Sequence, residues 1–480
     1  MTEASVSPAS PTTTIASSTE ALDDGARATR LRPILWRLHF LGGILAAPVA
    51  VWLALTGLLF AWNPQIESWL YGDEMRATAE GEPQPLADQL EAALAAHPDN
   101  VVVSVEPASG PGEATGVLMR PAGARAEGFG PAPGALTAYV DPVSAEVTGR
   151  VAEDERPDEW LRNLHSNFRI GTGPGTLTEL AASWVLVALL TGLYLWWPRS
   201  RRALRRALAP RLSGLRGGGR RPWRNLHSTL GAALFVVLGS IIVTGLTWTE
   251  YAGRWVDVAK DSLSVEAPML NTDLAAAEGD EGSAGGDHAE HRAGEPGSAA
   301  SLAAIDRVVD GAEAAGLTAP FTVTPASGSG QAWKVAEIDS RWPIDRTQVA
   351  IDPETGDVVD RIEFSDQALL DQATAVGIAF HEGSLFGLAN QVLLTLMAVA
   401  LLVLLVAGYM TWWRRRPAGA FGAPPKVGSL LRTAPVPLLA GFVVLLVLLP
   451  TLGVAFVGYL VIERLVRLVR HRRPPAPTPA

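Results

Sequence analysis

Histidines are scarce in this chain, and four of them stand in settings that repeat. The chain has 8 histidines in 480 residues. The pentapeptide Arg-Asn-Leu-His-Ser nevertheless occurs twice, around His165 and around His227. A neutral imidazole nitrogen is a common ligand of metal ions, including the iron of haem. Repeated histidine settings therefore raise the question of a metal or cofactor site.

The spacing of the histidines to later landmarks shows which of them correspond. His39 and His227 are each followed 17 residues later by a Thr-Gly pair. His165 and His381 are each followed 31 residues later by a Trp-Trp pair. The shared pentapeptide thus joins two histidines that are not equivalent, and the spacing predicts an internal duplication.

Long apolar windows indicate the class of protein. Five stretches contain no Asp, Glu, Lys or Arg, at 38–66, 180–198, 225–249, 383–413 and 433–462. A helix needs roughly 20 mostly apolar residues to cross a bilayer. We therefore expect an α-helical membrane protein with four core transmembrane helices in two repeated units, plus a C-terminal hydrophobic segment.

Charge is distributed unevenly between the segments that join these windows. Arg199–Arg224 contains ten arginines and no acid, whereas acids concentrate in 67–179 and 250–382. The positive-inside rule predicts a multi-pass protein of the cytoplasmic (inner) membrane, with the N-terminus in the cytoplasm and the acidic segments outside. Because the arginine-rich loop lies directly between two spans, we expect no nucleic-acid partner.

The chain contains no cysteine. Disulfides, iron–sulfur clusters, thiolate metal sites and covalent c-type haem attachment are therefore excluded. The N-terminal segment 1–30 lacks the basic-then-apolar start of a signal peptide and is rich in Ser, Thr and Ala. We expect it to be a disordered cytoplasmic tail.

The two acidic segments share one order of predicted elements. The first has a helical pattern at 86–97, and the second has one at 301–316. The hairpin YVDPVSAEVTGRV at 139–151 matches AIDPETGDVVDRI at 350–362. Two small extracytoplasmic α/β domains are therefore predicted, with strands at 101–105, 116–119, 136–140, 146–151, 321–324, 332–338, 347–351 and 357–362.

The patterns divide the chain as follows: tail 1–30, first span 31–66, first α/β domain 75–155, second span with its preceding histidine segment 156–198, basic cytoplasmic loop 199–224, third span 225–250, acidic Gly-rich linker 251–300, second α/β domain 301–365, fourth span with its histidine segment 375–413, cytoplasmic loop 414–433, C-terminal hydrophobic segment 434–464 and basic tail 465–480. Pro450 in the middle of 434–464 favours a helical hairpin over a single span, because a hairpin keeps the basic tail inside.

The four histidines form two predicted pairs, one at each membrane face. His39 and His227 enter their spans from the cytoplasmic side, whereas His165 and His381 precede theirs at the outer side. Two imidazoles on facing helices are the axial ligands that a b-type haem needs. The pattern therefore predicts two haem b groups, with these four histidines as ligands of the haem iron.

Glycines and arginines near the histidines fit the same cofactor. Glycine at helical spacing lets a flat ring lie against a helix, and guanidinium groups make charge-assisted hydrogen bonds to carboxylates such as haem propionates. The glycine candidates are Gly42, Gly43 and Gly231, and the propionate candidates are Arg37, Arg224, Arg162 and Arg169. The Trp-Trp pairs most simply form an interfacial aromatic belt, with a place beside a haem edge as the alternative.

Other readings of the histidines are a proton or metal pathway and a structural role. The predicted spans lack an Asp or Glu that a relay would use, and Glu382 is the sole acid adjacent to the set. His288 and His291, spaced i,i+3 in the linker, fit either a loose divalent-metal site or a solvated segment. His97 ends a predicted helix and is expected to be a capping residue.

The chain resembles the PepSY-associated transmembrane family over about residues 31–416. The resemblance is carried by WRLHFLGGILAAPVAVWLALTGLLF, WLRNLHSNFRIG, NLHSTLGAALFVVLGSIIVTGLTW, FHEGSLFG and the two Asp-Pro hairpins. It implies PepSY domains between paired spans. Some members of the family are iron-regulated inner-membrane proteins, and some are siderophore reductases with two b-type haems. His39, His165, His227 and His381 match the family's histidine positions.

These observations favour a di-haem transmembrane electron conduit that acts as a haem-dependent ferric reductase in iron acquisition. The expected acceptor is a ferric siderophore or another ferric chelate. No G-x-G-x-x-G follows a predicted strand and opens a helix, so the expected donor is a membrane quinol or a separate cytoplasmic reductase. The alternatives are a membrane-anchored PepSY module that regulates peptidases or envelope partners, and a metal or small-solute transporter.

Overall fold

The structure is a computed structural model that describes residues 15–126, 131–168, 175–198, 219–263, 268–274, 302–328, 330–342, 346–418, 422 and 434–471. It divides into two compact units. The helical unit comprises Met1–Ala54, Gly173–Val256 and Val399–Ala480, and the sheet unit comprises Leu55–Thr172 and Asp257–Ala398. Each unit is described by itself below.

Four helices in the described ranges are long and apolar enough to cross a membrane. They are Leu31–Ala61 within α1 (Ile15–Ala61), α5 (Thr176–Trp196), α7 (Arg220–Leu246) and α13 (Leu388–Trp413). Many of their apolar side chains are exposed on the protein surface, such as Val236 and Leu396, which are 72% and 63% exposed. Because such faces are stable in lipid and not in water, the chain is a multi-pass membrane protein.

The first helix is longer than the sequence pattern predicts. Helix α1 begins at Ile15, so it covers the second half of the segment 1–30 that we expected to be a disordered tail. Residues 15–30 contain several good helix formers, among them Ala, Glu and Arg, and they lead without a break into the apolar span. Residues 1–14 lie outside the described ranges.

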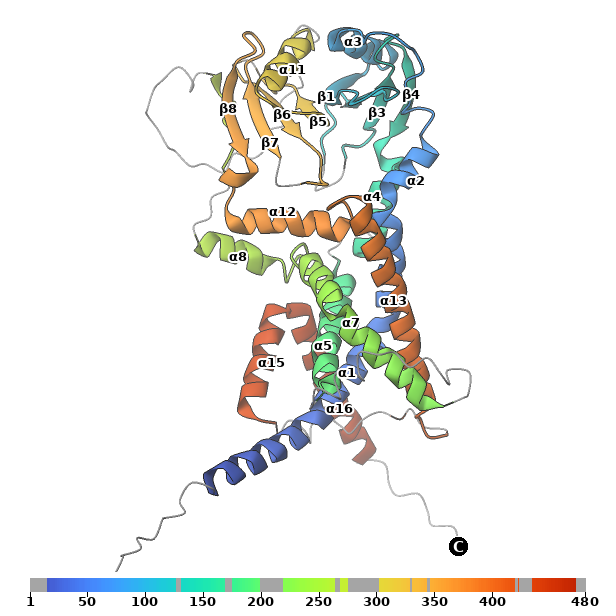
Figure 1. Cartoon of the computed structure of the whole chain (residues 1–480), viewed down its shortest axis with the longest axis vertical. Coiled ribbons are helices and arrows are strands. Elements are labelled where there is room, and N and C mark those ends of the chain that lie inside the picture. Colours follow the sequence, from blue (N-terminus) through green and yellow to red (C-terminus); the bar gives the residue numbers. More distant parts are fainter. Residues whose placement is uncertain are drawn as a thin grey trace, which may run out of the picture. The chain divides into compact units, whose positions relative to one another are not determined.

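The C-terminal hydrophobic segment is bent at a proline. Helix α15 (Val436–Leu448) and helix α16 (Pro450–His471) meet at an angle of 119°. Leu449, between them, has φ −121° and ψ 79°, because the ring of a following proline excludes the helical region for the residue before it. The bend lies where the sequence predicts the turn of a hairpin. Within the helical unit, α16 packs against α5 (Figure 1).

The sheet unit contains one antiparallel sheet of eight strands (Figure 1). Every strand predicted from the sequence is present. Their order across the sheet is β4-β3-β2-β1-β5-β6-β7-β8. Their bounds are β1 Asn100–Glu106, β2 Thr115–Pro121, β3 Leu136–Val140, β4 Val147–Ala152, β5 Phe321–Thr324, β6 Trp333–Glu337, β7 Thr347–Ile351 and β8 Val358–Glu363.

The two halves of this sheet have matching details. Helix α3 (Leu86–Ala96) precedes β1–β4, and helix α11 (Ile305–Ala314) precedes β5–β8. In the last hairpin of each half the register shifts at the same place, between Tyr139 and Val140 and between Ala350 and Ile351. An aspartate follows directly in both, at Asp141 and Asp352.

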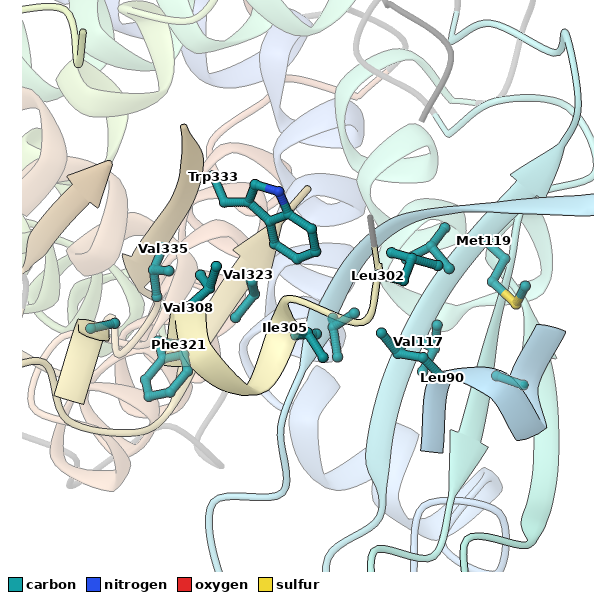
Figure 2. Packing of buried hydrophobic residues seen from close by; sticks show 14 of the residues in the cluster. Leu90, Val117, Met119, Leu302, Ile305, Val308, Phe321, Val323, Trp333 and Val335 are labelled. Carbon is teal, nitrogen blue, oxygen red and sulfur yellow. The ribbon is translucent and has the colours of Figure 1, made fainter. Parts of the chain in front are cut away.

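The two small α/β domains predicted from the sequence share one sheet in the structure. Strands β1 and β5 pair through Val105 and Val323, so the halves join edge to edge. One hydrophobic cluster then runs through both halves, from Val117 and Met119 on β2 past Ile305 on α11 to Trp333 and Val335 on β6 (Figure 2). The buried cluster is therefore continuous between the two halves and includes residues of both α3 and α11.

Short helices at the base of the sheet unit carry two of the predicted histidines. After β4 and the 3-10 turn η1 (Glu153–Glu155) comes α4 (Pro157–Asn167), and after β8 and η3 (Phe364–Asp366) comes α12 (Leu369–Glu382). Each ends in a left-handed residue, Phe168 with φ 61° and Gly383 with φ 93°. This conformation closes a helix end, and it places His165 and His381 in the last turn of their helices. Two further helices are α2 (Asn63–Leu70) and α8 (Arg254–Ser262).

Candidate functional site

His39 and His227 face one another in the helical unit. His39 comes from α1 and His227 from α7. Their Nε2 atoms are 3.5 Å apart, and their rings lie 5.8 Å apart between centroids at an angle of 73°. The sequence spacing that predicts this pair is therefore realised as a close approach of two imidazole nitrogens.

Backbone carbonyls fix the protonation of both rings. The Nδ1 atom of His39 is 2.8 Å from the carbonyl oxygen of Ala188 on α5, and that of His227 is 3.0 Å from the carbonyl oxygen of Leu404 on α13. A carbonyl oxygen only accepts, so each Nδ1 carries the ring proton and donates it. In a neutral ring Nε2 then bears a bare lone pair. Two bare lone pairs that face each other at 3.5 Å need an electrophile between them.

Two glycines back the same rings. A Cβ atom on Gly192 of α5 would lie 2.9 Å from His39 Cε1, and one on Gly408 of α13 would lie 3.1 Å from His227 Cε1 and Nδ1. Gly192 and Gly408 are separated by the same number of residues as His165 and His381. Each imidazole is thus held between a carbonyl and a glycine on the neighbouring helix, in equivalent ways.

A cavity of about 1030 Å³ surrounds this pair. Both histidines line it, together with Gly42, Gly43 and Gly231, the three glycines predicted to pack against a flat ring. Trp196 also lines it, and its buried Nε1–H finds no acceptor among the described residues. The cavity therefore offers an apolar slot, two imidazole nitrogens and a spare hydrogen-bond donor.

Among the described residues, four arginines and no carboxylate line the cavity. They are Arg32, Arg220, Arg224 and Arg415. The guanidinium of Arg415 stacks on the ring of Trp36, 4.7 Å from its centroid, and burial, with a contribution from the charge of Arg220, lowers its pKa. Like charges gathered without an acid favour an anionic ligand at this point. Arg224 is one of the predicted propionate partners, whereas the other three were not predicted.

Arg37 does not take the place that the sequence predicts. It is buried, it is absent from the lining of the cavity, and its guanidinium donates to the hydroxyl of Tyr459 on α16. The prediction considered only the distance of two residues along the sequence to His39. On a helix, residues two apart point to different faces, so Arg37 faces α16 when His39 faces the cavity.

His165 and His381 form the second pair, within the sheet unit. Their ring centroids are 6.4 Å apart at 77°. The hydroxyl of Thr56 lies 2.8 Å from His165 Nδ1, and a Cβ on Gly57 would lie 3.2 Å from His165 Cε1. Burial, and then the neighbouring His381, lower the pKa of His165 to about 4. The ring is thus neutral at pH 7 and keeps a lone pair for a metal.

The remaining predicted partners of this second pair differ in their placement. Arg162 donates to Asp158 at 2.9 Å and lies 3.8 Å from Glu382. It therefore stands beside the pair, but its charge already has carboxylate partners. Burial raises the pKa of Glu382, and Arg162 opposes that shift. Arg169, His288 and His291 lie outside the described residues, and His97 is the C-cap residue of α3, as predicted.

Within the described ranges no group of three or more His, Cys, Asp or Glu side chains could hold a metal ion. Each candidate centre of the described residues is a pair of histidines. Two protein ligands suit a metal that brings its other ligands with it, as iron does in a porphyrin, and they do not make the four-ligand cage of a structural zinc site.

Comparison with known proteins decides the family. The model of the PepSY-associated TM region matches residues 36–415. The chain belongs to the PepSY-associated TM family. All four paired histidines lie inside the matched region, whereas α15 and α16 lie beyond its end. No curated protein matches the sequence.

One buried acid of this family member was missed by the sequence analysis. Glu179, in the first turn of α5, is 1% exposed. Its carboxylate accepts from the backbone N–H of Tyr251 at 3.1 Å and from the hydroxyl of Thr451 on α16 at 3.0 Å. The charge-free window begins one residue after Glu179, so the statement that the spans lack an acid was wrong for this helix.

Asn390 is a second residue that spacing alone could not identify. It is 4% exposed in the first turn of α13. Its side-chain amide donates to the carbonyls of Phe380 at 2.9 Å and Ala379 at 3.3 Å in the last turn of α12. These bonds fix the end of α12, and they therefore also fix the position of His381, which follows Phe380 in the chain.

Proposed function

We propose that this PepSY-associated TM protein is a membrane electron conduit that binds two haem b groups and reduces a ferric chelate. The observation that carries the proposal is the His39–His227 pair. Both Nδ1 protons are committed to carbonyl oxygens, and both bare Nε2 atoms face each other at 3.5 Å. A bound metal ion is the electrophile that satisfies this arrangement best.

The dimensions of the site support an iron porphyrin. An imidazole nitrogen lies about 2 Å from a first-row metal ion such as zinc, so two axial nitrogens stand about 4 Å apart. The Nε2–Nε2 distance of 3.5 Å comes within roughly half an ångström of that separation. A Cβ on Gly43 would meet no atom within 4 Å, so this glycine leaves open space at the cavity, whereas a Cβ on Gly42 would lie 2.8 Å from the Trp184 carbonyl oxygen. The cavity volume of about 1030 Å³ suits a large ligand.

The residues of the chain have separable tasks in this proposal. His39 and His227, with His165 and His381 as the second pair, supply the axial nitrogens. The Ala188 and Leu404 carbonyls fix the tautomer and the angle of the first two rings. Arg224 is proposed to bind propionates, together with Arg32, Arg220 and Arg415. Bound haem supplies a one-electron ferric/ferrous couple at each pair.

The proposed reaction joins a donor to a ferric acceptor. A donor gives up electrons at the His39–His227 side, and each ferric chelate takes one electron at the His165–His381 side and becomes ferrous. Ferrous iron is softer than ferric iron, so hard oxygen ligands hold it less tightly. The arginine-rich loop supports a place in the cytoplasmic membrane with His39 and His227 near the cytoplasm. The matching halves of the sheet support an internal duplication.

An absorption spectrum of the purified full-length protein tests the proposal. We expect a low-spin Soret band and two haems per chain. His39→Ala and His227→Ala each remove one haem, and so do His165→Ala and His381→Ala. His97→Ala is the matched control, since this histidine caps α3 and belongs to neither imidazole pair. It keeps both haems.

Two results would contradict the proposal. A colourless protein after haem supplementation in the membrane would favour the non-redox readings, in which PepSY elements regulate peptidases or envelope partners or the helices transport a solute. If the haem spectrum is unchanged after both histidines of one pair are replaced, that pair is excluded as the haem ligands.

A further inference from the structure

A second cavity of the helical unit lies between the C-terminal hairpin and two core helices. Its volume is about 340 Å³. Its walls come from α1, α5, α15 and α16, and almost all of its lining side chains are apolar, among them Leu38, Val187, Leu190, Leu438, Phe442 and Phe456. The hydroxyl groups among the lining residues belong to Thr191 and Tyr194.

This cavity shares residues with the His39 site. Thr191 lines it, and the Thr191 hydroxyl is 3.5 Å from His39 Nδ1. Leu38, next to His39 in the chain, also lines it. The same turn of α5 that supplies the Ala188 carbonyl to His39 therefore forms a wall of the cavity. A ligand in the cavity would stand against the residues that hold the imidazole.

The cavity is accessible from the surface of the apolar helices. Leu190 and Tyr194 line it and are 45% and 40% exposed, and Gly441 on α15 lines it and is exposed. The surrounding helix α15 is composed almost wholly of apolar residues. A molecule dissolved in the bilayer could therefore enter without crossing water, whereas a polar cytoplasmic donor would meet mostly apolar side chains among the described residues.

Two buried polar contacts hold the hairpin that closes the cavity. The carboxylate of Glu179 on α5 accepts from Thr451 on α16, and Arg37 on α1 donates to Tyr459 on α16. Such contacts are costly in an apolar setting unless they are fully paired, so they favour one seating of the hairpin. The hairpin lies beyond the family region 36–415, so the cavity is built partly from residues outside that region.

We propose that this cavity binds the hydroquinone head of a membrane quinol, the donor of the proposed conduit. The inference rests on the proposed function. The apolar walls suit an isoprenoid quinol. The Thr191 hydroxyl donates to the Val187 carbonyl at 2.6 Å, so it can accept a hydrogen bond from a ring O–H of the hydroquinone, and the Tyr194 hydroxyl can donate to or accept from a ring oxygen. The overall reaction balances: one hydroquinone loses two electrons, releases two protons to water and becomes a quinone, and two ferric chelates each gain one electron.

A matched pair of glycine substitutions tests the cavity. A Cβ on Gly441 or on Gly458 would meet no atom within 4 Å, so both positions accept a side chain. Gly441 lines the cavity and Gly458, on α16, does not. Gly441→Leu therefore fills the cavity, whereas Gly458→Leu makes the same change on the same hairpin outside it, with the same gain in helix propensity.

Binding of decylubiquinone to the purified full chain is measured by quenching of tryptophan fluorescence. The rate at which decylubiquinol reduces the protein is measured from the Soret band, with dithionite as a reductant that needs no cavity. We expect Gly441→Leu to weaken binding and slow the quinol reaction by roughly 5- to 150-fold, because overpacking a filled site typically costs a free energy of that size. Gly458→Leu and all dithionite rates stay at the wild-type level.

The outcomes separate the two proposals. Haem-containing wild type that does not bind decylubiquinone, or Gly441→Leu that binds it like wild type, overturns the quinol site and leaves the conduit intact. Release of decylubiquinone by phospholipid at equal concentration also overturns it and identifies the cavity as a lipid acyl-chain site. If the wild-type protein is colourless but binds decylubiquinone, and the Gly441→Leu variant does not bind it, the result supports the site and refutes the haem conduit.

Discussion

The glycines behind the two imidazoles of the helical unit allow a graded test of the first histidine site. The change is Gly192→Ala on α5 or Gly408→Ala on α13. The new Cβ of Gly192→Ala would lie 2.9 Å from His39 Cε1, and that of Gly408→Ala would lie 3.1 Å from His227 Cε1. Carbon atoms pack best at about 3.5–4.0 Å. His39 must therefore retreat by roughly half an ångström or more, and His227 by somewhat less.

A shift of that size is enough to disturb a metal site. The His39 Nδ1 to Ala188 bond of 2.8 Å would lengthen beyond the usual range. A productive metal geometry is held within about 0.5 Å, and loss of a partner that orients a ligand weakens metal binding by about 10- to 100-fold. We expect Gly192→Ala to bind haem at that pair about 10- to 100-fold more weakly, and Gly408→Ala to show a smaller loss.

The assay is haem titration of protein purified from haem-depleted cells, followed at the Soret band, with the far-UV circular dichroism of each variant as a check of folding. Gly239→Ala on α7 is the control, because Gly239 does not line the cavity and its Cβ would make an ordinary 3.5 Å contact with Leu189. Alanine stabilises a helix relative to glycine, so a loss of haem affinity in these variants would not come from a less stable helix. Equal affinities for all three variants would refute the reasoning, as would a greater loss in Gly408→Ala than in Gly192→Ala.

Three further perturbations follow from other parts of the structure. Thr56→Val removes the hydroxyl beside His165 Nδ1 and should weaken haem binding at the His165–His381 pair by about 10- to 100-fold. Thr56→Ser keeps a hydroxyl and should bind haem as wild type does. A haem spectrum unchanged by Thr56→Val would argue against an orienting role. Burial tends to raise the pKa of Asp141, but four backbone N–H groups that bond its carboxylate lower it below its ordinary value. Because the folded pKa lies below the unfolded one, this group stabilises the fold above about pH 4 and loses that effect as pH falls through the folded pKa. Asp141→Asn should lower the free energy of unfolding by about 2–4 kcal/mol at pH 7 and make thermal stability less dependent on pH in the acid range. Asp352→Asn, where one backbone N–H bonds the carboxylate, should lower it less; equal losses would contradict the account. Glu179→Ala deletes both hydrogen bonds that the Glu179 carboxylate accepts from Tyr251 and Thr451 and should speed proteolysis of the C-terminal hairpin. A cleavage rate equal to wild type would show that these bonds do not hold the hairpin in place.

The sequence predicts those parts of the structure that depend on local pattern. The eight strands follow from alternation and from the two Asp-Pro turns, and the His39–His227 pairing follows from equal spacing in two halves of the chain. Periodicity and spacing are properties of the chain itself. They transfer to the structure without knowledge of how the helices cross.

Features that depend on helix crossings could not be predicted in this way. The orienting carbonyls and glycines lie on α5 and α13, far in sequence from the histidines that they support. Arg37 was assigned by its closeness in sequence to His39, although its helix face directs it to Tyr459. Arg415, which stacks on Trp36 at the cavity, lies at the end of a span with no histidine nearby in sequence. The joining of β1 to β5 was missed because edge pairing leaves no mark on either strand.

That joined sheet constrains how the protein can be made. Between β4 and β5 the ribosome must synthesise two long apolar helices, α5 and α7. Throughout that interval the edge of β1 has no partner, and an open strand edge can pair with another chain. The hydrophobic cluster also remains half covered, since α11 and its Ile305 have not yet been made. The newly made first half is therefore exposed to misassembly until the second arrives, and a truncation after α7 should aggregate rather than yield a smaller folded protein.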